Sequence, residues 1–258
     1  MGMALVRRVA GLSQGRWALV MAAMLGAAGA RSASAAPATA GIGYDYQGGP
    51  HGLRWNTPLG FVTIMGERKD GTLLISRYHS SDVGWGWSGL ANLGVSSSSG
   101  VGGRVIGSRS IGDGDYRAWR VQAGPTFALR ENRSLYVYGS HFEDSQGDRL
   151  NQIGGEAYFP LGPEFSGLAG VMLGNWQDNA SNAQGVLGVT WSCWRAVQVI
   201  GQTTFGKNIA SSSTTAVTGG AAGPFGSTGH GHMHTGSSSE TSGGAEAAIF
   251  GGIRISIP

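Results

Sequence analysis

Near the C-terminal end of the chain, apolar and polar residues alternate. Every second position is held by Ile249, Gly251, Ile253, Ile255 and Ile257, and between them lie Gly252, Arg254 and Ser256. Because successive side chains of a β-strand point to opposite faces, this segment would have one apolar and one polar face. A soluble sheet buries the apolar face in a core, whereas a membrane barrel turns it toward lipid and the polar face toward a lumen.

The N-terminal residues have the layout of a secretory signal peptide. Arginines at positions 7, 8 and 16 precede an apolar run from Trp17 to Ala30, and Ala33-Ser34-Ala35 follows as a cleavage site with small residues. The apolar run is shorter than the roughly 20 residues of a membrane-spanning helix. We therefore expect residues 1–35 to direct Sec-type export and residues 36–258 to form the mature domain.

The charge of the mature chain gives no reason to expect a nucleic-acid partner. Four of the 18 basic residues lie in the predicted signal peptide, which leaves 14 basic against 15 acidic residues and a net charge of −1. The basic character of the full chain thus belongs to the segment that export would remove. Cys193 is the only cysteine, so an intramolecular disulfide framework is excluded.

The mature chain consists of about twelve short segments with strand character. After residue 35 no stretch is apolar enough for a transmembrane helix, and only helices and closed barrels satisfy their own backbone in lipid. Several segments are close to the length that a tilted strand needs to cross a bilayer. The predicted strands are 40–47, 56–66, 71–79, 84–96, 101–112, 116–130, 134–142, 148–159, 165–176, 184–194, 196–206 and 245–257.

Two-residue periodicity assigns polar side chains to one face of several predicted strands. Trp119, Val121 and Phe127, for example, would share a face opposite Arg120 and Gln122. The residues expected to line the lumen of a barrel are Arg120, Gln122, Arg130, Glu156, Gln198, Gln202 and Arg254. They carry both signs of charge, so they could pair as a polar plug or line a path for solutes. The segments 71–79 and 134–142 carry apolar residues on both faces.

The connections agree with an even number of strands whose two ends lie in the periplasm. The expected periplasmic turns, around 67–70, 97–100, 131–133, 160–164 and 194–195, are all short. The opposite, outer side would hold the connections 48–55, 143–147 and 177–183 and a long Gly/Ser/His-rich flexible loop at 207–244. Short periplasmic turns and longer external loops are typical of bacterial barrels.

These features together resemble the bacterial outer-membrane β-barrel proteins. The C-terminal pattern of Gly252, Ile255 and Ile257 is similar to the assembly signal of that class, although the chain ends in Pro258 instead of an aromatic residue. The tryptophans near strand ends, at 85, 87, 119, 176, 191 and 194, would form interfacial girdles. The resemblance implies an all-β, antiparallel up-and-down transmembrane barrel of about 12 strands in a Gram-negative outer membrane, with lipid and the barrel-assembly machinery as partners.

Two histidine-containing segments raise other chemistry. His79 and Ser81 share a face at the outer end of a predicted strand, and outer-membrane acyl hydrolases use such a His-x-Ser pair as base and nucleophile. His230, His232 and His234 could chelate Zn²⁺ or Cu²⁺, but the Gly- and Ser-rich residues around them offer no preformed geometry. We expect no resident metal and no other cofactor.

The sequence therefore favours a non-enzymatic outer-membrane barrel. It would act as a narrow pore for a small solute or as a structural or export-associated component, for instance for an exported polymer. One alternative is a barrel-embedded lipid acyl hydrolase using His79 and Ser81. A further alternative is a soluble secreted β-sandwich that binds its ligand through the tryptophans.

Overall fold

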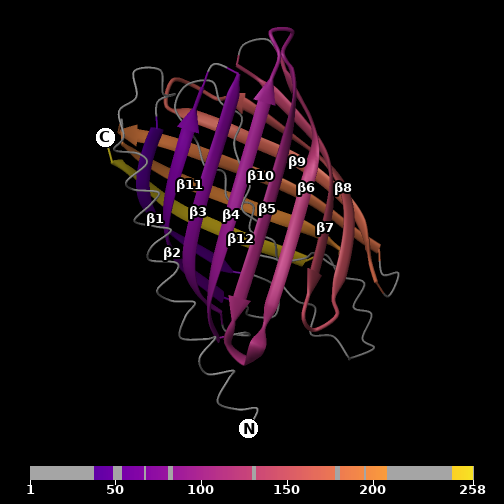
Figure 1. Ribbon diagram of the computed structural model, residues 1–258. Coiled ribbons are helices and arrows are strands. Elements are labelled where there is room, and N and C mark those ends of the chain that lie inside the picture. The colour runs from indigo at the N-terminus through magenta and orange to yellow at the C-terminus, as the bar shows by residue number, and fades with distance from the viewer. Residues whose placement is uncertain are drawn as a thin grey trace.

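Twelve antiparallel strands form a single closed barrel in the computed structural model (Figure 1). The structure describes residues 38–48, 54–66, 68–80, 84–129, 132–177, 181–194, 196–207 and 246–257. The strands are β1 (Ala38–Gly48), β2 (Arg54–Met65), β3 (Lys69–Ser80), β4 (Gly84–Ser96), β5 (Val101–Gly112), β6 (Arg117–Ala128), β7 (Ser134–Asp144), β8 (Arg149–Pro160), β9 (Phe165–Trp176), β10 (Ser181–Trp194), β11 (Val197–Lys207) and β12 (Glu246–Ile257). The twelve-stranded antiparallel barrel expected from the sequence is thus confirmed.

Each strand pairs with its neighbours in the sequence, and β1 pairs with β12 to close the barrel. The closing register runs from Ala40 opposite Ile257 to Gly48 opposite Ile249. The strands of the near wall cross those of the far wall at a steep angle, as strands tilted in a closed barrel do (Figure 1). Closure leaves no free sheet edge, so backbone groups along the wall are paired between strands. The two stacked sheets of a β-sandwich are not present in the described chain, and that alternative is wrong.

The alternation of side chains places apolar residues on the outer face of the barrel, where a soluble protein would have polar residues. Along β12 the outward Ile249, Ile253, Ile255 and Ile257 are exposed, whereas the inward Phe250 and Arg254 are buried. The same alternation recurs around the wall, where leucines, valines, isoleucines and aromatic residues are exposed. An apolar exterior of this extent requires lipid around it. The chain is therefore a membrane-spanning barrel.

Most aromatic residues of the exterior lie near the two ends of the strands. Trp85, Trp87 and Trp119 lie toward the end away from the termini, and Trp191 and Trp194 lie toward the end that carries them. Such girdles are typical of membrane barrels. Trp176 differs from the expectation, because its side chain is buried inside the barrel with only 7% exposed.

The end of the barrel away from the termini, which the sequence predicts to be external and which we call the outer end, has shorter connections than expected. The segments 81–83, 113–116, 145–148 and 177–180 have three or four residues and 49–53 has five, which is within the range of two to five residues for the turns at the opposite end. A short 3₁₀ turn, η2 (Asp113–Asp115), connects β5 and β6. The outer end is thus distinguished by one long connection, 208–245, all of which lies outside the described residues, as does the predicted signal peptide.

No helix in the part of the chain that the structure describes is long and apolar enough to cross a membrane.

Candidate functional site

The interior of the barrel is the candidate site, and side chains occupy it at several levels. Near the end that carries the termini, the Arg104 guanidinium donates to Asp70 Oδ2 at 2.8 Å and to Asn92 Oδ1 at 3.0 Å. These residues come from β5, β3 and β4, so the side chain of Arg104 reaches past the neighbouring strand. Arg104 is almost fully buried. Its charge is therefore neutralised inside the wall.

A second buried ion pair lies where the barrel closes. Both terminal nitrogens of Arg254 on β12 donate to the carboxylate of Asp45 on β1, with Nη2 at 2.8 Å from Oδ2. Both residues are buried. A bidentate arginine–carboxylate pair fixes the relative orientation of its partners. This pair thus joins the first and last strands from inside.

Glu156 on β8 is the centre of a third polar cluster, in the middle of the barrel. Its carboxylate accepts hydrogen bonds from the hydroxyl groups of Tyr138, at 2.9 Å, and Tyr158, at 2.6 Å. The Tyr138 ring also contacts Tyr136, with 4.9 Å between ring centroids. These tyrosines belong to a larger buried cluster contributed by eight strands: Leu59, Phe61, Leu74, Leu90, Ile106, Tyr136, Tyr138, Tyr158, Leu168, Met172 and Val186. The mid-section of the interior is therefore mainly apolar.

Amide side chains and Arg120 form the next level toward the outer end. Arg120 Nη2 donates to Gln152 Oε1 at 3.2 Å, and Gln152 Nε2 donates to Asn182 Oδ1 at 2.9 Å. Gln184 and Gln202, on β10 and β11, are also buried, but neither Gln184 amide atom has a hydrogen-bond partner among the described residues, and nor does Gln202 Oε1. Buried polar groups normally have a partner in protein or water. This level of the interior is therefore suited to water or a polar solute.

Aromatic residues narrow the outer end of the barrel. Trp55 and Tyr78 are in ring contact at 4.9 Å, and they belong to a buried cluster with Tyr116, Ala118, Phe142, Leu150 and Trp176. All of these residues lie at strand ends or in the turn between β5 and β6, away from the termini. The interior thus changes from charged to apolar to polar and ends in an aromatic layer.

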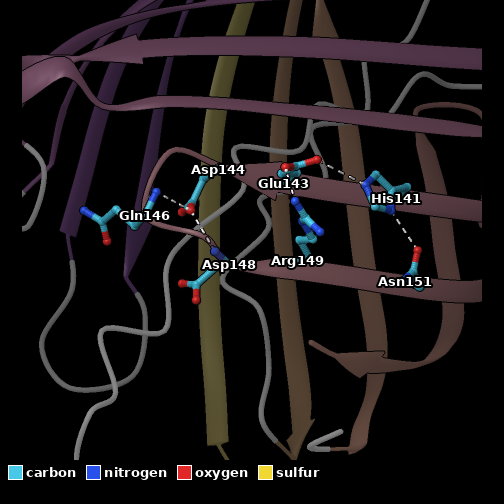
Figure 2. A network of polar contacts seen from close by, with 7 residues as sticks. All are labelled: His141, Glu143, Asp144, Gln146, Asp148, Arg149 and Asn151. Atoms are coloured by element: carbon cyan, nitrogen blue, oxygen red, sulfur yellow. Dashed lines mark hydrogen bonds and ion pairs between the residues drawn. The ribbon is translucent and has the colours of Figure 1, made fainter. Parts of the chain in front are cut away.

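The β7–β8 hairpin shows how the outer rim is held (Figure 2). Asp144 Oδ1 accepts hydrogen bonds from the backbone N–H groups of Gln146, at 2.9 Å, and Asp148, at 3.0 Å. On the outward face, Arg149 donates to Glu143 at 3.0 Å, and His141 contacts Asn151 at 2.7 Å (Figure 2). A carboxylate that binds backbone N–H groups two and four residues ahead stabilises a tight turn. The rim at this hairpin is therefore well ordered.

The structure places the residues expected in the lumen as follows. Arg120, Gln122, Glu156, Gln202 and Arg254 have buried side chains in the wall that faces inward, and Gln198 is half-buried on the same face near the end with the termini. Arg130 lies outside the described residues. That these side chains line a path for solutes remains a prediction.

The sequence pattern did not predict Asp45 and Asp70 as partners of the interior arginines. Arg104 shares its inward face with Ile106, and Val105 shares its outward face with Arg109. Polar and apolar residues thus occur on both faces of β5, which hides the period. The strand that contains Asp45 has glycine and polar residues on its inward face, and the strand that contains Asp70 has both polar and apolar residues there. Only the barrel geometry brings these acids to the arginines.

The alternative sites receive no geometric support. The ring of His79 faces outward, with its centroid 4.6 Å from that of Trp85, while Ser81 lies outside the described residues. The described chain contains no group of three residues able to hold a metal ion, and His230, His232 and His234 lie outside it. A catalytic pair and a metal site therefore stay predictions without a described geometry.

Comparison with known proteins supports the fold. No family model and no curated protein matches the sequence. Among solved structures, the KdgM porin in complex with disordered oligogalacturonate is similar with a TM-score of 0.55 and 7% identity, over 84% of this chain and 99% of that one. The NanC porin is similar with a TM-score of 0.52 and 7% identity, over 85% of this chain and 100% of that one. The fold is that of bacterial outer-membrane porin-type β-barrels.

Proposed function

We propose that this protein is a narrow outer-membrane pore for small polar solutes. The observation that carries the proposal is the buried, incompletely paired amide level at Gln184 and Gln202 inside a barrel whose exterior faces lipid. A purely structural barrel would be more stable with an apolar interior, because unpaired buried polar atoms are costly. The apolar middle and the aromatic outer layer lie across the interior, so a solute would have to pass between these side chains.

The interior favours small solutes over a long acidic polymer. KdgM was solved with oligogalacturonate, and such a polyanion would need free cationic groups along its path. In this chain Arg104 is bound to Asp70 and Arg254 is bound to Asp45. Arg120 lies near Glu156 and donates a hydrogen bond to Gln152. Their positive charge is compensated, and the pore should have little preference for anions.

The proposal includes the route of the protein to its membrane. A signal peptide at residues 1–35 would direct Sec-type export, and the barrel-assembly machinery would insert the mature chain through its C-terminal strand. The lipid of the outer membrane would then cover the exposed aliphatic wall. The two buried arginine–carboxylate pairs alone would also suit a structural barrel, which is the competing function within the same fold.

Solute efflux from proteoliposomes tests the pore. Purified barrel is reconstituted into vesicles loaded with a monosaccharide, its uronic acid, or a trimer of that acid, and efflux is followed after dilution. We expect release of the two monomers at similar rates and retention of the trimer. Empty vesicles and vesicles with heat-denatured protein are the controls. Retention of every solute would refute the pore, and rapid release of the trimer would refute the narrow, charge-compensated interior.

A further inference from the structure

The outer wall of the barrel carries an apolar groove over β3, β4, β5 and β6. The groove has a volume of about 410 Å³. Its floor consists of Gly89, Ala91 and Gly107 on the two central strands, between the larger side chains of the flanking strands, Leu73, Ile75, Trp119 and Val121. A Cβ added at Gly89 or Gly107 would meet no atom within 4 Å. The wall is therefore hollow here because side chains are missing from its outer face.

Two arginines lie on the same lipid-facing wall, at the end of the groove away from the termini. Arg109 lies opposite Gly89 and Trp119 in the strand register, and Arg77 lies opposite Trp87. Both arginines are exposed. The Arg77 guanidinium lies 4.7 Å from the centre of the Trp85 ring, and Arg109 has no ion pair among the described residues. The outward Glu143 nearby is bound to Arg149.

The depth of these arginines matches the headgroup region of the outer leaflet. They lie at the level of Trp87 and Trp119, within the outer aromatic girdle. A charged side chain on the lipid-facing wall is unfavourable near the bilayer midplane and is tolerated near the interface. Arginine binds phosphate through directed, charge-assisted hydrogen bonds. The groove below would receive an aliphatic chain attached to that phosphate-bearing headgroup.

We propose that this groove, with Arg77 and Arg109, is a binding site for lipid A, the phosphorylated glycolipid of the outer leaflet. The two guanidinium groups bind phosphate on the sugar headgroup, and one acyl chain lies on Gly89, Ala91 and Gly107 between Ile75 and Val121. Lipid A is favoured as occupant because it combines phosphate with acyl chains on the leaflet that this end of the barrel faces. The inference rests on the orientation of the barrel and is independent of conduction.

Two variants separate the headgroup contact from the chain contact. Arg77→Gln/Arg109→Gln removes both charges, and Gly107→Leu places an apolar side chain in the groove at a position where a Cβ meets no atom within 4 Å. Their matched controls are Arg149→Gln, which removes an outward arginine bound to Glu143, and Gly201→Leu, since a Cβ at Gly201 also meets no atom within 4 Å. The heat-dependent shift in electrophoretic mobility shows that each variant is folded.

Native mass spectrometry of the detergent-solubilised barrel, titrated with lipid A, measures binding. We expect lipid A to bind the wild type and both controls with similar affinity. Its affinity for the double arginine variant should be lower by about tenfold or more, because charge-assisted hydrogen bonds are lost. Gly107→Leu should weaken binding of lipid A to a similar degree. Dephosphorylated lipid A should bind wild type no better than lipid A binds the arginine variant.

Three outcomes would overturn the proposal. Equal binding of lipid A to all variants would show that neither the arginines nor the groove matters. Phosphatidylglycerol binding as tightly as lipid A would show that any anionic lipid suffices. A dimer of the wild type that Gly107→Leu dissociates would show that a second copy of the chain fills the groove. None of these results depends on whether the barrel conducts.

Discussion

Buried charges in the interior of this barrel are held by specific partners. The Asp45–Arg254 pair joins β1 to β12, and the Asp70–Arg104 pair reaches from β3 to β5. Removing a charge from water is costly, and a buried pair recovers that cost only when both members are present. Loss of one member should therefore matter far more than loss of an exposed pair.

Asp45→Asn should destabilise the barrel by about 3–5 kcal/mol, because it leaves the Arg254 charge buried without its carboxylate. Asp45→Asn/Arg254→Met should recover most of that loss, since no buried charge is left. Arg149→Gln, in the exposed pair with Glu143, should change the free energy of unfolding by about 0–1 kcal/mol. Guanidinium unfolding in lipid vesicles, followed by tryptophan fluorescence, measures all three. Equal effects for Asp45→Asn and Arg149→Gln would contradict this account of the interior.

At the scale of the strand, the sequence predicted the wall better than the interior. The twelve strands and the outward faces of β6, β8, β11 and β12 follow from two-residue alternation, because lipid demands apolar side chains at every outward position. For the segments 71–79 and 134–142, the sequence did not show which face of the strand is lipid-facing. In the structure Leu74 and Tyr138 face inward into the apolar mid-section, so these strands are apolar on both sides.

The pairing of interior side chains could not be predicted from strand patterns. Arg104 meets Asp70 and Asn92 through the curvature of the wall, which brings inward side chains of neighbouring and next-neighbouring strands together. Trp176 shows the same limit, because a position near a strand end does not reveal which face the residue occupies. The outer groove likewise depends on glycines that become neighbours only through strand register.

An arginine on the outer face should be costly in the middle of a strand and tolerated at its end. Leu187 lies in the middle of β10 and Trp194 at its end, and both side chains are exposed to lipid. Leu187→Arg should destabilise the barrel by about 2–4 kcal/mol and Trp194→Arg by about 0–1 kcal/mol, because the cost depends on depth in the bilayer. Reversible unfolding in vesicles gives both values. A larger destabilisation by Trp194→Arg than by Leu187→Arg would show that the bilayer midplane does not lie at the middle of β10.

The whole molecule combines a lipid-facing wall with an interior that side chains fill. The polar amide level lies between the apolar middle and the aromatic outer layer, and the charged pairs lie at the other end. Leu90, 6% exposed, and Met172, 1% exposed, belong to the apolar middle, whereas Leu93 and Leu173 lie on the same two strands and face lipid. Truncation of Leu90 and Met172 would therefore enlarge the interior, and truncation of Leu93 and Leu173 is the matched control on the outer face.

Single-channel recording in planar bilayers tests the narrow pore most directly. We predict small, discrete conductance steps for the wild type and for Leu93→Ala/Leu173→Ala. Leu90→Ala/Met172→Ala should give clearly larger steps, because truncation widens the apolar middle through which solutes must pass. Absence of conductance in the wild type and in the interior variant would contradict the pore and indicate a structural barrel. Equal conductance in both double variants would show that the apolar middle does not control passage.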